Sequence, residues 1–342
     1  MKAVYFDTHG GVDVLKYGDR PDPVISDNEV LVRLKAASIN HLDIWVRQGL
    51  PGIPIPLPHI LGNEGAGEVA AVGKNVKHVK PGDRVLVTPG LNCGECTYCS
   101  AGWDSACPQY KLTGFQVDGC YAELVKAPAH NILPISKKFS FEEWASIPLV
   151  FITAYHMLFT RAGLKTGETV LVQAGGSGIG IAAIQLAKQA GARVITTAGS
   201  DEKLAKAKSL GADFGINYKK EDTAKRVLDI TGGKGVDVVF EHIGPETWDA
   251  SMKCLGKLGR LVTCGATSGP KVEIDLRFLY MKQLTILGSY MGGRRELDKA
   301  LALFEAGKLK PVVDKIFPLK DARAAHEYML DRKNFGKIVL TV

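Results

Sequence analysis

The sequence lacks long apolar runs, low-complexity tracts and blocks of like charge, and each absence excludes a class of protein. The longest apolar run, from Ala145 to Phe159, is too short to cross a bilayer and contains polar residues. The N-terminus alternates as a strand does, and it has no apolar core with a cleavage site that would indicate a signal peptide. With 46% hydrophobic and 23% charged residues, the composition is that of a folded globular protein.

Basic residues are not concentrated anywhere, although the formal net charge is +7. A nucleic-acid-binding protein usually gathers lysine and arginine in a patch or along a motif helix, and neither pattern is present. A small anionic ligand explains the mild basic bias equally well. We therefore expect a small-molecule substrate, no nucleic acid and no membrane partner.

The length of 342 residues suits two domains better than one. Short apolar runs broken by Gly and Pro dominate the first part and are typical of β-strands. From about Phe141, strands and helices alternate, which predicts a parallel, doubly wound sheet. The alternation stops near Tyr290. We predict an α/β fold in which residues 1–140 and 291–342 form a mostly β domain and residues 141–290 form a nucleotide-binding domain.

Four of the seven cysteines stand at C-x2-C-x2-C-x7-C spacing: Cys93, Cys96, Cys99 and Cys107. Without a signal peptide, this pattern indicates a metal site in a reducing compartment, so we expect a cytoplasmic location. An iron–sulfur cluster is the alternative, but the last cysteine gap of ferredoxins is shorter and no second cluster motif is present. Four thiolates close a tetrahedral shell and leave no position for a substrate. We predict one structural zinc ion in the loop of residues 92–108.

A strand, a glycine-rich turn and a helix follow one another from Glu168 to about Gln189. In such units, backbone N–H groups of the turn and of the helix N-terminus bind the pyrophosphate of a dinucleotide. The middle glycine of G-x-G-x-x-G is a serine here, and a purely structural glycine turn is the alternative. The predicted pyrophosphate contacts are Gly175, Gly176, Ser177, Gly178, Ile179 and Gly180.

The end of the next strand determines which nicotinamide cofactor we expect. NAD-specific sites place Asp or Glu there to bond the ribose 2′-hydroxyl, whereas this strand ends at Ala198. Ser200 can donate a hydrogen bond to a 2′-phosphate, Lys203 can supply a positive charge, and Tyr218 can close the pocket. The alternative for Lys203 is a solvated lysine on the helix surface. We expect Asp201 to cap the following helix rather than to bind ribose. The sequence therefore predicts NADPH, with NADH as the alternative.

The segments "PLPHILGNEGAGEVAAVG" and "IPLVFITAYHML", the cysteine loop and the nucleotide-binding unit together resemble the medium-chain dehydrogenase/reductase superfamily. The resemblance covers essentially the whole chain. It implies a GroES-like β domain, a Rossmann domain, and a homodimer or homotetramer in which the strand "LTILGSY" pairs with its twin. In the zinc alcohol dehydrogenases of that superfamily, a Cys, a His and a further Cys hold a catalytic zinc, apart from the structural zinc of the cysteine loop.

The three catalytic ligand positions of that pattern hold Asn40, Asn63 and Leu149 in this chain. Asparagine oxygens are poor zinc ligands and leucine is none. A rearranged site that uses His41 and His59 is the alternative. The loss of all three ligands resembles the zinc-free quinone oxidoreductase-like branch, although the retained cysteine loop is less typical of it.

Candidate catalytic residues come from these emptied positions and their acidic neighbours. Asn40 or Asn63 can donate an N–H to a substrate oxygen, or else bond the backbone of a turn. Asp43 and Glu64 are further candidates, and they serve equally well as partners in structural ion pairs. The sequence shows no proton donor, and solvent is the alternative source of the proton.

By resemblance, further cofactor contacts are expected near the nicotinamide and at one phosphate. The predicted nicotinamide and ribose contacts are Thr153, Thr263, Gly265, Leu287 and Ser289. His41 is the predicted phosphate contact, with a solvated loop histidine as the alternative.

Without a Lewis acid, hydride transfer to an already electrophilic acceptor demands least of the protein. The sequence therefore predicts NADPH-dependent reduction of a quinone or an α,β-unsaturated carbonyl. The alternatives are an alcohol or aldehyde dehydrogenase with a rearranged or metal-free site, and a non-catalytic NADPH-binding protein.

Overall fold

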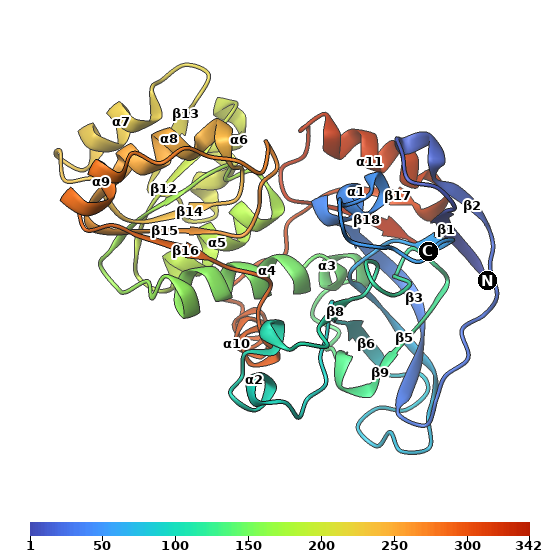
Figure 1. Cartoon of the computed structure of the whole chain (residues 1–342). Coiled ribbons are helices and arrows are strands. Elements are labelled where there is room, and N and C mark those ends of the chain that lie inside the picture. The colour runs from blue at the N-terminus through green and yellow to red at the C-terminus, as the bar shows by residue number, and fades with distance from the viewer. The chain divides into compact units, whose positions relative to one another are not determined.

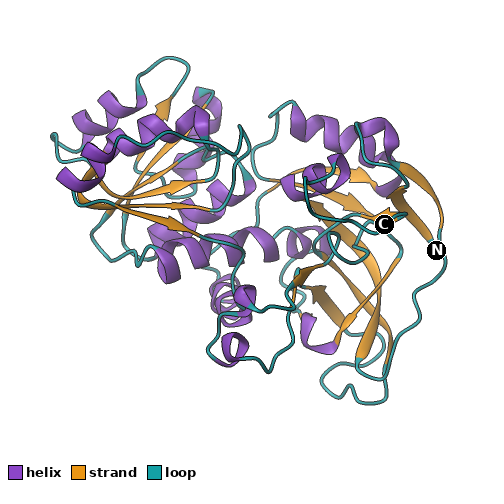
Figure 2. Ribbon diagram, viewed as in Figure 1, coloured by secondary structure: helices purple, strands orange, loops and turns teal.

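The structure is a computed structural model that describes all residues, Met1–Val342, and it divides into two compact units. Unit 1 comprises Met1–Leu149 and Pro311–Val342, and unit 2 comprises Val150–Lys310. Figure 1 labels the elements in chain order, and Figure 2 shows where helices, strands and loops lie. None of the helices combines the length and the apolar character that crossing a membrane requires.

Unit 1 is built around one long strand, β3 (Glu29–Ile39), whose apolar residues alternate toward a buried face. It pairs antiparallel with three strands, β5 (Gly65–Val72), β9 (Leu124–Pro128) and β18 (Lys337–Thr341). The sheet continues to β6 (Arg84–Val87), β10 (Ile132–Pro134) and β17 (Val313–Pro318). Smaller sheets consist of β1 (Lys2–Phe6), β2 (Lys16–Asp19) and β4 (His59–Ile60), and of β7 (Gly90–Leu91) and β8 (Lys111–Leu112).

Short helices complete unit 1. The α-helices are α1 (His41–Gln48), α2 (Thr97–Ser100), α3 (Phe141–Ala145) and α11 (Ala322–Leu330). The 3-10 turns are η1 (Val12–Val14), η2 (Asp104–Ala106), η3 (Ala129–Asn131) and η5 (Leu319–Asp321).

Unit 2 contains a six-stranded sheet in which every strand pair is parallel, in the order β13-β12-β11-β14-β15-β16. Counted within the unit, this order is 3-2-1-4-5-6, that of a doubly wound dinucleotide-binding fold, so the predicted fold class is confirmed. The strands are β11 (Thr169–Val172), β12 (Arg193–Ala198), β13 (Phe214–Asn217), β14 (Val236–Glu241), β15 (Leu255–Thr263) and β16 (Thr285–Gly288).

The helices of unit 2 follow these strands in alternation. They are α5 (Gly178–Gln189), α6 (Asp201–Ser209), α7 (Thr223–Ile230), α8 (Pro245–Cys254), α9 (Leu276–Met281) and α10 (Arg294–Glu305). Ahead of the sheet, α4 (Pro148–Tyr155) continues into a π-helical turn, η4 (His156–Arg161). Most residues of the central strands β11, β12 and β14 are buried because helices cover the sheet, which explains their apolar runs.

The observed units differ from the predicted domain boundaries at two places. Helix α3 belongs to unit 1 because it packs on β3 and β5. Residues 291–310, which the sequence assigned to the first domain, belong to unit 2. The physical reason is that the buried carboxylate of Glu296 on α10 bonds to His156 and Thr160 on η4.

Glu296 should therefore contribute strongly to the stability of unit 2. His156 Nδ1 lies 2.9 Å from one carboxylate oxygen, and the Gly293 N–H donates to the other at 2.6 Å. We expect Glu296→Ala to lower the free energy of unfolding by about 2–4 kcal/mol, because it removes a buried acceptor of several hydrogen bonds. Urea denaturation measures this. Asp298→Ala on the same helix, which breaks only an exposed pair with Arg294, should change little; equal losses would contradict the assignment.

Candidate functional site

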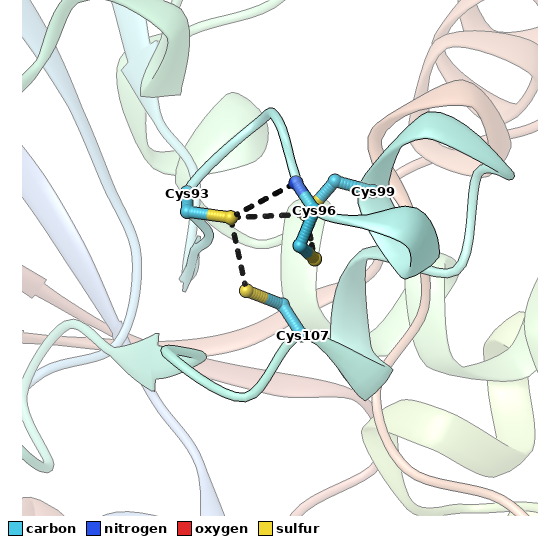
Figure 3. A group of neighbouring side chains, drawn as sticks. All are labelled: Cys93, Cys96, Cys99 and Cys107. Carbon is cyan, nitrogen blue, oxygen red and sulfur yellow. Dashed lines mark hydrogen bonds between the residues drawn. The ribbon is translucent and has the colours of Figure 1, made fainter.

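The four clustered cysteines have the geometry of a metal site. Three sulfur–sulfur distances are 3.9 Å for Cys93–Cys99, 3.5 Å for Cys96–Cys99 and 3.5 Å for Cys93–Cys107, and all four Sγ atoms lie within 4.8 Å of one another (Figure 3). Tetrahedral Zn–S bonds of about 2.3 Å place neighbouring sulfurs about 3.8 Å apart. The residues present therefore fit one zinc ion, and no other such group of His, Cys, Asp or Glu occurs in the chain.

A buried lysine that the sequence analysis did not single out lies at one emptied ligand position of unit 1. Lys337 begins β18 and is 5% exposed. Its Nζ donates to Asn40 Oδ1 at 2.5 Å, to Glu64 Oε1 at 3.0 Å and to the Ile39 carbonyl at 3.0 Å. An ammonium has three N–H donors, so all of them are satisfied. The pairing of β18 with β3 brings Lys337 to Asn40. Because the two residues are far apart in the sequence, their contact could not be predicted from it.

Glu64 is a fully buried carboxylate that accepts four hydrogen bonds. Besides Lys337, Oε1 accepts from Ser38 Oγ at 2.5 Å and from Asn40 Nδ2 at 3.0 Å. Oε2 accepts from the Leu149 N–H at 2.5 Å. Glu64 thus connects two of the three emptied positions, and its burial favours a positioning role over contact with a substrate.

The donor set at the emptied positions does not fit a catalytic zinc ion. The Asn40 oxygen already accepts from a buried ammonium, whose charge would repel a divalent cation. Asn63 Nδ2 donates to the Thr113 carbonyl at 2.8 Å, which leaves only its Oδ1, a buried atom without a hydrogen-bond partner. The alternative ligands His41 and His59 do not form a ligand group with any third residue.

Asp43 holds the backbone at two of these positions. It is 0% exposed and accepts from the Asn40 N–H at 2.7 Å, the Gly62 N–H at 3.0 Å and the Tyr121 hydroxyl at 3.0 Å. Burial raises the pKa of Asp43 to about 6, although these hydrogen bonds oppose the shift. Because Gly62 precedes Asn63, Asp43 bonds to the backbone of both asparagine segments, which also favours a positioning role.

The glycine-rich turn between β11 and α5 allows close backbone approach. A Cβ added at Gly175 would lie 2.0 Å from Thr196 Oγ1, and one added at Gly180 would lie 2.4 Å from the Ala174 carbonyl. Ser177 caps α5 by accepting a hydrogen bond from the Gly180 N–H at 3.0 Å. The predicted pyrophosphate contacts thus lie in a strand–turn–helix unit, the arrangement that binds a dinucleotide phosphate.

The end of β12 presents hydroxyl groups and no free carboxylate. Ser200 caps α6, accepting from the Lys203 N–H at 3.3 Å, so the prediction that Asp201 caps this helix is wrong. Asp201 instead accepts from Asn217 Nδ2 at 2.7 Å and from Lys220 Nζ at 2.6 Å. The Ser200 hydroxyl keeps its hydrogen as a donor, because it acts only as an acceptor in the cap.

Lys219 also lies beside the end of β12, and the sequence analysis did not identify it. A Cβ added at Gly199 would lie 2.7 Å from Tyr218 Oη and 3.3 Å from Lys219 Cε. The tyrosine ring and the lysine side chain therefore lie against the backbone that follows β12. The signal in the sequence was the position of Lys219 directly after Tyr218, at the end of the third strand.

The predicted nicotinamide contacts lie mostly at the carboxyl ends of β15 and β16. The Ser289 N–H donates to the Thr263 carbonyl at 2.8 Å, and Thr263 Oγ1 donates to the Gly265 carbonyl at 3.3 Å. Leu287 pairs with the strand residue just before Thr263. Thr153 on α4 is buried and bonds to Met291 Sδ at 3.8 Å. This edge of a parallel sheet is where doubly wound folds bind ligands.

His41 is the one predicted cofactor contact that belongs to unit 1. It begins α1 of unit 1, and its ring lies edge-on to the Trp45 ring with 5.0 Å between centroids. Its predicted role at a cofactor phosphate stays a prediction.

Two protein families match this chain. The alcohol dehydrogenase GroES-like domain matches residues 26–137, and the zinc-binding dehydrogenase family matches residues 178–306. A zinc-type alcohol dehydrogenase-like protein of Schizosaccharomyces pombe is 35% identical over 100% of this chain and 99% of its own. A quinone oxidoreductase of Pseudomonas aeruginosa is 34% identical over 99% of both chains. A solved structure of an NAD-dependent alcohol dehydrogenase is 46% identical over 100% of both chains, with a TM-score of 0.97.

Asp43 should give the protein an unusual pH dependence. Its pKa is raised from 3.8 to about 6 in the folded state, so the folded protein binds the proton more tightly than the unfolded chain. This contribution to stability is complete below about pH 4 and is lost as the pH rises through about 6, by on the order of 3 kcal/mol. We expect the Asp43→Asn variant to gain stability relative to the wild type across this window. Urea denaturation from pH 4 to 7 measures the difference.

The exposed carboxylate of Asp298 provides the control for this measurement, since Asp298→Asn should give a curve parallel to that of the wild type. A parallel curve for Asp43→Asn would contradict the assignment of a buried, proton-binding carboxyl.

Proposed function

The chain belongs to the medium-chain dehydrogenase/reductase superfamily and is an NAD(P)H-dependent oxidoreductase, and on this premise we propose that it reduces a quinone or an α,β-unsaturated carbonyl without a catalytic zinc. One observation carries the proposal: the Lys337 ammonium bonds to the amide oxygen of Asn40, at a position where a zinc enzyme needs a thiolate. Neither Asn63 nor Leu149 supplies a soft ligand in compensation.

The chemistry suits an acceptor that is already electrophilic. NADPH, when bound, supplies the hydride, and negative charge then develops on the acceptor oxygen. An amide NH2 has two donors, and Asn40 uses one of them on Glu64, which leaves one N–H for that oxygen. The Lys337 ammonium on the amide oxygen polarises this N–H and contributes positive potential. Asn40 is the proposed oxyanion donor, Lys337 and Glu64 position it, and solvent supplies the proton.

NADPH is the proposed cofactor because of the charges at the end of β12. Lys203 and Lys219 bring positive charge, and the hydroxyls of Ser200 and Tyr218 can donate to a 2′-phosphate. The nearby carboxylate of Asp201 is neutralised by Lys220 and bonded to an amide, so it neither repels a phosphate nor bonds a ribose hydroxyl freely.

The four-cysteine cluster is proposed to hold one structural zinc ion, which would fold the loop around α2 and η2. This requires reduced thiolates and therefore fits a reducing, cytoplasmic location.

We also propose a homodimer or homotetramer. β16 is the edge strand of its sheet, with unpaired backbone groups along one side. The adjoining α9 exposes Leu276 to 65%, Tyr280 to 66% and Met281 to 69%. An apolar surface beside an open strand edge is the feature that strand pairing between two copies would cover.

An alcohol or aldehyde dehydrogenase that works without a catalytic zinc is the second candidate. The observation in its favour is the 46% identity to a protein named as an NAD-dependent alcohol dehydrogenase.

An acceptor screen combined with zinc analysis tests the proposal. We expect about one zinc per chain, and oxidation of NADPH in preference to NADH with quinones, enals or enones. Saturated ketones and aldehydes should be poor acceptors, because they place the full charge on one oxygen.

Alcohol oxidation with one zinc ion per chain would support the second candidate instead, and a second zinc ion per chain would contradict the absence of a catalytic zinc. Tight NADPH binding without turnover of any acceptor would indicate a non-catalytic protein.

Lys219 should contribute to the choice of cofactor. We expect Lys219→Ala to raise KM for NADPH about tenfold, through loss of one charge-assisted contact to the 2′-phosphate, and to leave KM for NADH nearly unchanged. Steady-state kinetics with both cofactors measures this. Lys208→Ala, an exposed lysine on α6, is the matched control and should change neither constant. A similar rise for NADPH and NADH would argue against a 2′-phosphate contact.

A further inference from the structure

A chain of buried hydrogen bonds in unit 2 links the carboxylate of Glu241 to the glycine-rich turn. Glu241 ends β14, is 0% exposed, and its Oε2 accepts from Ser251 Oγ at 2.8 Å. Ser251 Oγ accepts from Gln173 Nε2 at 2.9 Å, and Gln173 Oε1 accepts from Thr197 Oγ1 at 2.7 Å. Thr197 Oγ1 in turn accepts from the Ala174 N–H at 3.0 Å. The chain thus crosses from β14 through β11 to β12.

The carboxylate fixes the direction of every link in this chain. Glu241 can only accept, so the Ser251 hydroxyl must donate to it and must receive the Gln173 N–H. This orients the Gln173 amide with its oxygen toward Thr197. The Thr197 hydroxyl donates to that oxygen, and its lone pair remains for the backbone N–H of Ala174.

The far end of the chain holds a strained residue. Ala174 has a φ of 48°, in the left-handed region that residues with a side chain rarely adopt. It begins the turn whose next residue, Gly175, also bonds to Thr197 through its N–H, at 2.8 Å to the carbonyl. Such a conformation persists only where the surroundings over-determine it. The Thr197 hydroxyl helps to hold Ala174 in this conformation by accepting a hydrogen bond from its N–H.

The other carboxylate oxygen of Glu241 shapes the loop after β14. Oε1 accepts from the Ile243 N–H at 2.6 Å and the Gly244 N–H at 3.1 Å, and Thr247 Oγ1 donates to both oxygens. All of the donors around Glu241 are neutral groups of unit 2, so the carboxylate is not part of an ion pair. A buried carboxylate used in this way organises the loops around it rather than balancing a cation.

We propose that Glu241 is a positioning residue for dinucleotide binding, which acts through Ser251, Gln173 and Thr197 to fix the left-handed turn at Ala174. This proposal rests on the proposed cofactor role of the glycine-rich turn. The turn presents its backbone N–H groups to the pyrophosphate only in this conformation. Removing any hydrogen bond of the chain therefore lowers the affinity for the pyrophosphate.

Binding measurements on chain variants test the proposal. Ser251→Ala and Thr197→Val interrupt the chain at two links, Glu241→Gln replaces its acceptor, and Thr247→Val is the matched control, because it removes a Glu241 partner outside the chain. Fluorescence titration gives Kd for NADPH and NADH. Competition gives Kd for 2′-AMP and adenosine, which lack the pyrophosphate. Thermal unfolding confirms that each variant is folded, and the two single-link variants suffice if Glu241→Gln does not fold.

We expect the chain variants to weaken the dinucleotide that the wild type prefers by about five- to twentyfold, with the nucleoside fragments unchanged within about twofold. Thr247→Val should bind like the wild type. The Ser251→Ala/Thr197→Val double variant should lose no more affinity for the dinucleotide than the single variant with the larger loss, because both substitutions break the same chain.

Unchanged dinucleotide binding in folded chain variants, equal loss for the fragments, or an equal effect of Thr247→Val would each overturn the inference. A wild type that binds neither dinucleotide would overturn the proposed function together with it, whereas binding by the wild type with unaffected variants would overturn this inference alone.

Discussion

The buried ion pair between Glu64 and Lys337 is the interaction on which the segments around Asn40 and Leu149 in unit 1 depend. It joins β18 near the C-terminus to the segment that follows β4. Both groups are almost inaccessible to water, so each would be costly to bury alone. They are tolerated together because every donor of the ammonium and both oxygens of the carboxylate are hydrogen-bonded. The same contacts immobilise Asn40, so stability and the proposed chemistry rest on one network.

A comparable principle operates in the nucleotide-binding unit. Two of its buried polar residues, Gln173 and Glu241, lie at the carboxyl ends of parallel strands, and Glu241 bonds to the backbone of the loop that follows it. Glu241 and Gln173 sit among apolar strands that fill the rest of the sheet. Burial makes their hydrogen bonds directional and hard to rearrange, which is useful where a turn must hold a strained residue such as Ala174.

In the proposed function, metal binding and hydride transfer use different residues of this chain. The cysteine cluster has a complete set of four soft ligands and no place for a substrate, whereas the emptied positions have two hard amide oxygens, one of which is bonded to a buried ammonium. A ligand set can therefore be lost from one position while the fold around it survives, because a buried ion pair holds the same segments in place.

The sequence by itself determined the features that depend on residues close together in the chain. The cysteine spacing, the strand–turn–helix unit of residues 168–189 and the alternation of β and α elements are local patterns, and the structure agrees with each. The absence of zinc ligands at Asn40, Asn63 and Leu149 could also be recognised from the sequence. Tertiary structure alone decided what replaced them. Lys337 reaches Asn40 because β18 pairs with β3, and no local sequence pattern predicts a contact between residues so far apart in the chain. The cap of α6, the return of the chain to unit 1 after residue 310, and the chain from Glu241 to Ala174 were settled in the same way, by side chains that meet only after the sheet has formed.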